Sequence, residues 1–320
     1  MNILVTGGAG FIGSNLVDRL VEEGHKVVVI DNLSTGKIEN VHSKAKFYKL
    51  DICNKKIRDI FKSEKIEVVY HKAAQIDVQK SIEDPIFDGK VNILGTINVL
   101  EACKKANVKK IIYPSSAAVY GEPKYLGIDE NHPTCPISYY GISKFTPENY
   151  IKTYSKFYDI DYTIFRYSNA YGIRQDPKGE GGVIAIFMQK LFKGESPTIF
   201  GDGSATRDFI YIDDIIEANI KALHKGSREV FNIGTGVATS IKELFYIMKE
   251  IMGADVKVKY GKEREGDIKN SFFNIDKAEE KLNWIPKYRL EEGLYKTIKY
   301  YKELLMEETE DEIAVTMDDR

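Results

Sequence analysis

The feature that most constrains the fold is the alternation of short β-branched runs with longer helical patterns in the first half of the chain. Five runs are typical of buried strands: NILVT (2–6), KVVVI (26–30), KFYKL (46–50), EVVYH (67–71) and KKIIYP (109–114). Helical patterns cover residues 11–24 and 92–106. Because such β-α-β units place their strands parallel and their helices on both faces, the sequence predicts an α/β fold with a doubly wound parallel sheet.

The alternation stops after YTIFRYS (162–168), where loops rich in glycine and proline begin. These loops indicate a smaller α/β unit over the carboxyl edge of the sheet. We expect DFIYIDD (208–214) and VFNIGTG (230–236) to return to the sheet as strands. The predicted division is one domain of 1–170 plus 208–236, a second of 171–207 plus 237–306, and an acidic tail, 307–320, that is a helix end or disordered.

Composition excludes several classes of function. The 320 residues are 43% hydrophobic, and the net charge of −2 gives no basic footprint for nucleic acid. No apolar run approaches the roughly 18 residues of a membrane span, and MNILVTGG lacks the basic region of a signal peptide. Cys53, Cys103 and Cys135 are scattered and odd in number, so we expect a cytoplasmic protein without disulfides or a metal site.

The loop TGGAGFIG (6–13) follows the first strand and opens the first helix. It fits both G-x-G-x-x-G and G-x-x-G-x-x-G, and glycines there let backbone amides approach a pyrophosphate at the helix N-terminus. Asp31 closes the second strand, where a carboxylate can accept hydrogen bonds from ribose hydroxyls and would repel a 2′-phosphate. A plain turn also uses glycines, but the strand, loop, helix and acid together predict a Rossmann domain that binds NAD rather than NADP.

A second motif, SYYGISK (138–144), places Tyr140 four residues before Lys144. In a helix these two side chains share a face, while Tyr139 points elsewhere. Taken alone, the pair also fits a surface helix with a cation near an aromatic ring. The segment SSAAVYG (115–121) follows a strand and adds Ser116 to the set.

These motifs, taken in order, resemble the extended short-chain dehydrogenase/reductase family of the NAD-dependent epimerase/dehydratase type, and within it most closely the UDP-glucose 4-epimerases. The resemblance runs from residue 1 to about residue 300. Beyond the two motifs above, it rests on DNLS (31–34), LDI (50–52), HKAA (71–74), NILGT (92–96), RYSNAYG (166–172), TRDFIYIDD (206–214) and REGD (264–267).

The resemblance implies that Ser116, Tyr140 and Lys144 are catalytic. A free tyrosine has a pKa near 10, and about 4 kcal/mol is needed to lower that pKa by about three units. The Lys144 ammonium and the positive nicotinamide ring both favour the phenolate. Tyr140 would then take the proton of the sugar 4-hydroxyl as hydride leaves for the nicotinamide. The resulting 4-keto sugar would turn over, and the hydride would return to its other face, so that NAD stays bound.

The same resemblance assigns residues to the two ligands. The cofactor would contact Gly7, Gly10, Phe11, Ile12, Gly13, Asp31, Asn32, Ser34, Gly36, Asp51, Ile52, Ala73, Ala74, Gln75, Asn92, Ser115, Tyr140, Lys144, Tyr167 and Ser168. The UDP-sugar would contact Ser116, Tyr140, Asn169, Gly182, Val183, Thr198, Phe200, Arg207, Arg264, Asp267 and Ser271. Ser271 stands where the family places the residue beside the sugar 2-substituent, and this small side chain predicts room for an N-acetyl group.

Other activities remain open at this stage. A dehydratase or decarboxylase of the family needs a further acid–base pair, which Ala117 and Ala118 do not supply. An epimerase of UDP-uronic acids needs a group to hold the carboxylate, and the sequence reveals none. A non-catalytic NAD-binding sensor would usually lose the tyrosine or the lysine. Pro147, three residues after Lys144, departs from the family and can kink its helix. By family analogy we expect a homodimer formed through the helices near 90–106 and 140–157.

Overall fold

The computed structural model describes residues 1–176, 182–263 and 268–318, with side chains up to residue 306. Its centre is a seven-stranded sheet in which all neighbouring strands are parallel, in the order β11-β6-β5-β4-β1-β2-β3. The strands are β1 (Asn2–Thr6), β2 (Lys26–Asp31), β3 (Lys46–Lys49), β4 (Val68–His71), β5 (Lys110–Ser116), β6 (Asp161–Tyr167) and β11 (Glu229–Ile233). The predicted α/β, doubly wound Rossmann sheet is confirmed, and its strand order reverses between β1 and β4.

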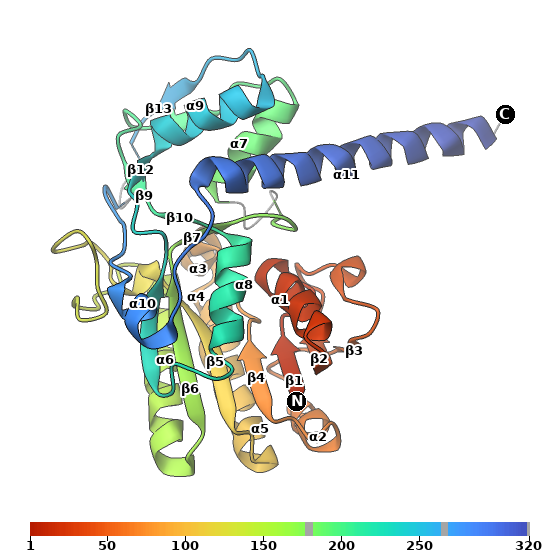
Figure 1. Cartoon of the computed structure of the whole chain (residues 1–320), viewed down its shortest axis with the longest axis vertical. Coiled ribbons are helices and arrows are strands. Elements are labelled where there is room, and N and C mark those ends of the chain that lie inside the picture. The colour runs from red at the N-terminus through yellow and green to blue at the C-terminus, as the bar shows by residue number, and fades with distance from the viewer. Residues whose placement is uncertain (177–181, 264–267, 319–320) are drawn as a thin grey trace.

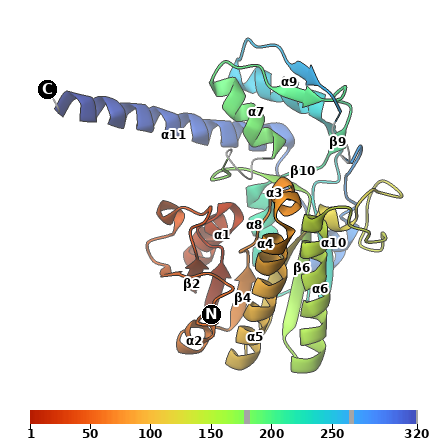
Figure 2. The same cartoon turned by 180° about the vertical axis from the view of Figure 1, so that it is seen from behind.

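Helices cover both faces of this sheet (Figures 1 and 2). One face carries α1 (Phe11–Glu22) and α8 (Ile212–Lys221), and the other carries α2 (Ile57–Ser63), α5 (Thr96–Ala106) and α6 (Tyr139–Tyr158). Side chains of β1 alternate between the two layers: Ile3 and Val5 pack in the core beside α1, and Leu4 packs in the core beside α5. This alternation is why a run of continuous apolar residues forms a strand that is buried on both faces.

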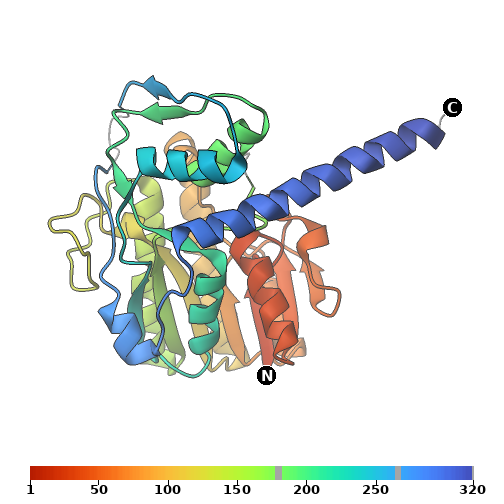
Figure 3. The same cartoon turned by 45° about the horizontal axis from the view of Figure 1, so that its top comes forward.

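A smaller layer lies over the carboxyl edge of the sheet (Figures 1 and 3). Its strands form pairs: β7 with β10, β8 with β13, and β9 with β12. The bounds are β7 (Asn169–Tyr171), α7 (Val183–Phe192), β8 (Thr198–Phe200), β9 (Thr206–Arg207), β10 (Phe209–Tyr211), β12 (Thr239–Ser240), α9 (Ile241–Met252), β13 (Lys259–Gly261) and α11 (Leu290–Asp318). Helix α10 (Asp276–Leu282) instead packs beside β11 of the central sheet. The figures show α11 projecting away from the body, so residues 307–318 are the end of a helix.

Of the two segments predicted to return to the central sheet as strands, one does and the other does not. The segment 230–236 does return to the central sheet, as β11 beside β6. The segment 208–214 does not: β10 pairs with β7 outside that sheet, and a helix begins at Ile212. The first turn of α8 contains Asp213 and Asp214, which favour a helix N-terminus over a longer strand. The division of the chain into two domains stays a prediction.

The helix expected over 92–106 begins earlier and in an unusual form. Residues Lys90–Gly95 form a π-helical turn, η2, that continues directly into α5. The remaining short elements are η1 (Ile38–Asn40), α3 (Val78–Glu83), α4 (Pro85–Gly89) and η3 (Ala117–Val119). Within the described residues, no helix has the length and apolar character needed to cross a membrane.

A buried ion pair fixes α6 against the ends of β5 and β6. Arg166 on β6 donates to both carboxylate oxygens of Glu148 on α6, at 3.0 and 2.8 Å. Ser115 on β5 donates to the same carboxylate at 2.6 Å, and Arg166 also donates to the Tyr120 hydroxyl at 2.9 Å. Glu148 is fully buried and Arg166 nearly so, so both charges depend on these partners.

We expect Arg166→Met to lower the free energy of unfolding by about 3 kcal/mol, the low end of the range for breaking a buried pair, because Lys152 still lies 3.6 Å from Glu148. The measurement is equilibrium unfolding in urea. Arg228→Met is the control, since Arg228 pairs with Asp159 at an exposed site and its removal should cost about 0–1 kcal/mol. Equal losses in the two variants would contradict this role for the buried pair.

Candidate active site at the carboxyl edge of the sheet

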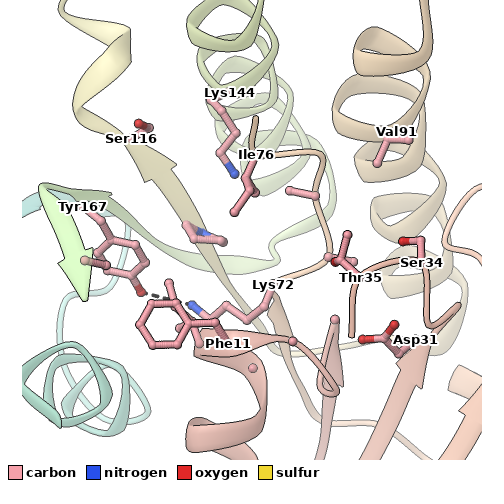
Figure 4. A pocket seen from close by; sticks show the side chains of 18 of the residues that line it. Phe11, Asp31, Ser34, Thr35, Lys72, Ile76, Val91, Ser116, Lys144 and Tyr167 are labelled. Atoms are coloured by element: carbon pink, nitrogen blue, oxygen red, sulfur yellow. Dashed lines mark hydrogen bonds between the residues drawn. The ribbon is translucent and has the colours of Figure 1, made fainter. Parts of the chain in front are cut away.

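A cavity of about 310 Å³ opens at the carboxyl edge, where the order of β1 and β4 reverses. In open α/β sheets this point of reversal is where ligands bind. The cavity reaches from Asp31 and Ser34 on one side to Ser116 and Tyr167 on the other, with Lys144 projecting into it from α6 (Figure 4). The glycine loop after β1 forms one wall.

Two glycines of this loop have no room for a side chain. A Cβ on Gly13 would stand 2.0 Å from the carbonyl oxygen of Gly7, and a Cβ on Gly7 would stand 2.6 Å from the amide nitrogen of Ala73. Gly7 also has a φ of +68°, which favours glycine. These contacts bring the first turn of α1 against the ends of β1 and β4.

Gly10 differs, because the protein itself leaves space beside it. A Cβ there would meet only the Gly7 carbonyl oxygen, at 3.4 Å, which is close to an ordinary contact. Gly10 lines the cavity and is the residue before the first turn of α1. The cradle beside Gly10, at a helix N-terminus with unpaired backbone amides, therefore fits the pyrophosphate of a dinucleotide.

Asp31 sits at the end of β2 and is mostly buried. Its Oδ2 accepts from the amide of Ala9 at 3.0 Å, and its Oδ1 accepts from the amide of Leu33 at 2.8 Å. These bonds tie the carboxylate to the glycine loop and aim it at the cavity, which it lines. Each carboxylate oxygen has a further lone pair, so hydroxyls of a ribose can also bind there.

Helix α6 presents Tyr140 and Lys144 to the cavity. Ser138 caps this helix by accepting from the amide of Gly141 at 3.0 Å. Tyr139 is 52% exposed on another side of α6, so the helical register is the one that the spacing predicts. Pro147 lies within the same continuous helix, which runs on to Tyr158.

The Lys144 ammonium lies in a buried and balanced electrostatic environment. Its Nζ stands 4.7 Å from the centroid of the Tyr113 ring. Burial lowers the pKa of Lys144 to about 7, while the carboxylates of Asp88 and Glu148 act in the opposite direction. The two carboxylates thus preserve part of the cationic character that burial removes.

Ser116 ends β5 and lines the cavity. Its Oγ accepts from the amide of Ala118 at 3.2 Å and caps the turn η3. The structural role and a role toward a ligand are compatible, because the hydroxyl keeps its own proton to donate and a second lone pair.

Most of the predicted cofactor residues lie together on the cavity wall. These are Gly7, Gly10, Phe11, Ile12, Gly13, Asp31, Asn32, Ser34, Asp51, Ile52, Ala73, Ala74, Ser115, Tyr140, Lys144, Tyr167 and Ser168. Gly36, Gln75 and Asn92 do not line it. A Cβ on Gly36 would stand 2.9 Å from Ala9, so Gly36 supports the glycine loop from behind.

Gln75 and Asn92 belong to a buried network behind the wall. Asn92 accepts from the amide of Gln75 at 2.8 Å and donates to Ser143 of α6 at 2.9 Å. Both side-chain amides donate to Asp88 Oδ1, at 2.8 Å from Gln75 and 3.1 Å from Asn92. The network joins the loop after β4, the π-helical turn and α6, so these residues position the cavity wall.

The residues expected to bind the UDP-sugar are less closely gathered. Ser116, Tyr140, Asn169 and Gly182 line the cavity, whereas Val183, Thr198, Phe200, Arg207 and Ser271 do not. Ser271 lies beside β9, where its amide donates to the Thr206 carbonyl at 3.2 Å. Arg264 and Asp267 lie outside the described residues. The structure therefore brings four of the eleven residues of this set to the cavity wall, and the other described members lie away from it.

Several cavity residues were not predicted, among them Thr35, Lys72, Ile76, Val91 and Gln175. Lys72 had a usable signal, because a charged residue directly after a buried parallel strand lies at the edge where ligands bind. Ile76 and Val91 had none, since apolar residues in a connecting segment indicate packing as readily as a cavity wall.

Comparison with known proteins shows to which family the chain belongs. Residues 3–234 match the model of the NAD dependent epimerase/dehydratase family, and the chain belongs to that family. A protein of Methanocaldococcus jannaschii is 50% identical over 301 residues, which are 94% of this chain and 98% of that protein.

Two solved structures are similar over almost the whole chain. The UDP-glucose 4-epimerase of Thermotoga maritima, with UDP-glucose, has a TM-score of 0.94 and 47% identity, and the match covers 95% of this chain and 100% of that one. The UDP-glucose 4-epimerase of Thermus thermophilus, in complex with NAD, has a TM-score of 0.89 and 38% identity, and the match covers 94% and 99%.

The two kinds of glycine give a paired prediction. Gly13→Ala should lower the free energy of unfolding by about 1–3 kcal/mol, because the Gly7 carbonyl oxygen must move. Gly10→Ala should change that free energy by less than about 1 kcal/mol but should remove the bound dinucleotide, because the methyl group occupies the cradle. Urea unfolding and the dinucleotide released per protein on denaturation measure the two effects. A Gly10→Ala protein with normal dinucleotide content would show that the cradle is elsewhere.

Proposed function

We propose that this protein is a UDP-glucose 4-epimerase that interconverts UDP-glucose and UDP-galactose through a transient 4-keto sugar, with NAD as its tightly bound cofactor. One observation carries the proposal: Ser116, Tyr140 and Lys144 line the same cavity as the glycine loop and Asp31. A proton acceptor thus stands beside the place for a dinucleotide. The family to which the chain belongs and its similarity to two UDP-glucose 4-epimerases support the same conclusion.

The residues of this chain manage the proton of the sugar 4-hydroxyl. Tyr140 accepts that proton at its phenolate oxygen and later returns it, and Ser116 hydrogen-bonds the same sugar oxygen. The Lys144 cation stabilises the phenolate electrostatically. Bound NAD supplies the chemistry that accepts a hydride from the sugar C4 and gives it back. Because the hydride is returned to the carbon from which it came, the cycle would end with the cofactor in its starting state.

The composition of the cavity argues against elimination chemistry. A dehydratase needs a further acid–base pair near the tyrosine. The turn that follows Ser116 carries Ala117 and Ala118, whose methyl groups cannot transfer protons. We therefore assign the 4-keto sugar the role of an intermediate that is reduced again. The smaller layer, with Arg207, is assigned to the uridine diphosphate half of the substrate. By the resemblance, Arg264 and Asp267, which lie outside the described residues, are assigned to the same half.

The surface supports a homodimer formed through α5 and α6. Leu94, Ile142, Tyr150, Phe157 and Tyr158 are between 41% and 70% exposed on η2, which leads into α5, and on α6. A row of large apolar side chains along adjacent helices suits a self-complementary interface between two copies.

The three thiols are free, which fits a reducing cytoplasm.

We predict that Tyr140→Phe lowers kcat by about 10²- to 10⁴-fold, because the phenylalanine ring cannot exchange a proton. Bound dinucleotide and UDP-sugar affinity should be retained, since the ring still fills the same space. The measurement is the conversion of UDP-galactose to UDP-glucose, with dinucleotide content measured in parallel. The matched control is Tyr139→Phe, one residue earlier and exposed, which should leave kcat little changed. If the Tyr139 variant were the inactive one, the assignment of the base would be wrong.

A second prediction concerns the range of UDP-sugars that the protein accepts. If Ser271 stands beside the sugar 2-substituent, the protein should also interconvert UDP-GlcNAc and UDP-GalNAc. Ser271→Tyr should then lower kcat/KM for the N-acetylated pair at least about tenfold by steric exclusion, while UDP-glucose and UDP-galactose are little affected. Steady-state kinetics with both pairs measures this difference. Equal losses for the two pairs, or a wild type inactive on N-acetylated sugars, would discard the role of Ser271 and leave the epimerase assignment intact.

A further inference from the structure

Lys72 is the first residue after β4 and lines the cavity where the strand order reverses. His71, just before it, points to the other face of the sheet and is hydrogen-bonded to Thr6. The Lys72 side chain therefore lies on the side of α1 and α8. Its Nζ donates to the Tyr167 hydroxyl at 3.2 Å (Figure 4). The same Nζ donates to Asn219 Oδ1 at 2.7 Å.

These two partners are neutral, and this distinguishes the half-buried Lys72 from Lys110, which is buried beside a carboxylate. Within the described residues, no carboxylate lies within ion-pairing distance of Lys72, whereas Lys110 pairs with Asp161 at 3.1 Å. Burial, and then the charge of Lys144, lower the pKa of Lys72 well below its ordinary value. An ammonium in such a place is unfavourable until an anion joins it. Within the described residues, the Lys72 ammonium makes these two hydrogen bonds, and its third N–H donates to no protein atom.

The backbone of Lys72 packs against the glycine loop. The position of a Cβ on Gly7 lies 2.8 Å from the Lys72 carbonyl carbon and 2.6 Å from the Ala73 amide nitrogen. Phe11, the first residue of α1, lines the same cavity as Lys72 (Figure 4). Lys72 thus shares this cavity with the cradle beside Gly10, which fits a pyrophosphate. That group carries two negative charges, and backbone amides neutralise them only in part.

We propose that Lys72 is an anion-binding residue of the cofactor site and donates its third N–H to an oxygen of the NAD pyrophosphate. Asn219 and Tyr167 hold the ammonium in position for this contact. The inference rests on the proposed function, because it takes NAD to be the ligand of the cavity. The diphosphate of the sugar nucleotide has the same chemistry, but the proposed function assigns it to the smaller layer rather than to the glycine loop, so separate probes for the two ligands distinguish the two sources.

The test is Lys72→Met, which keeps a long unbranched side chain and removes the charge. Dissociation constants are measured by calorimetry on the full-length protein freed of dinucleotide, with NAD, ADP-ribose, adenosine and UDP as separate probes. We expect NAD and ADP-ribose to bind about ten- to a hundredfold more weakly, as for a lost hydrogen bond to a charged group. Adenosine and UDP should bind as they do to the wild type.

The thermal unfolding midpoint of the ligand-free protein distinguishes a binding role of Lys72 from a purely structural one. Loss of a structural residue would lower this midpoint. Lys72→Met should leave this midpoint unchanged or raise it, because a half-buried charge without an ion-pair partner is removed. Lys110→Met is the matched control: it should lower the midpoint and leave the NAD affinity unchanged. A Lys72→Met protein with unchanged ADP-ribose affinity would overturn the inference, as would weaker binding of UDP alone. A wild type that binds no NAD would instead overturn the proposed function.

Discussion

The contact between Gly13 and the carbonyl oxygen of Gly7 determines how closely α1 approaches the sheet. Any side chain at position 13 would collide with that oxygen, and any side chain at position 7 would collide with the backbone after β4. Because both contacts are made by backbone alone, the N-terminus of α1 lies directly over the point where the strand order reverses. The cavity, the aim of Asp31 and the place of Lys72 all follow from this close packing.

The opposite wall depends on buried charge rather than on close backbone packing. Glu148 and Asp88 lie behind the cavity and serve two purposes at once. They accept hydrogen bonds that fix β5, β6 and the π-helical turn relative to α6, and they counteract the effect of burial on the pKa of Lys144. Since the same carboxylates hold the scaffold and counteract the effect of burial on Lys144, the geometry and the electrostatics of this wall cannot be changed independently.

The sequence predicted those parts of the site that one local motif determines. The glycine loop needs its glycines for contacts within a few residues, and the Tyr140–Lys144 pair needs only one helical turn. The features that the sequence did not reveal depend on distant partners. Gln75 and Asn92 lie behind the wall because Asp88 and Ser143 draw their amides inward. Segment 208–214 pairs with β7 because Asn169–Tyr171 leaves the central sheet, which no pattern in either segment reveals.

The central claim is that the sugar is oxidised and then reduced at the same carbon by a cofactor that never leaves. Nuclear magnetic resonance of the product formed from UDP-galactose deuterated at C4, with no added dinucleotide, tests it most directly. The account predicts UDP-glucose that retains deuterium at C4, because the hydride removed from that carbon is the one returned. UDP-glucose that carries protium at C4, or the absence of any UDP-glucose, would contradict it.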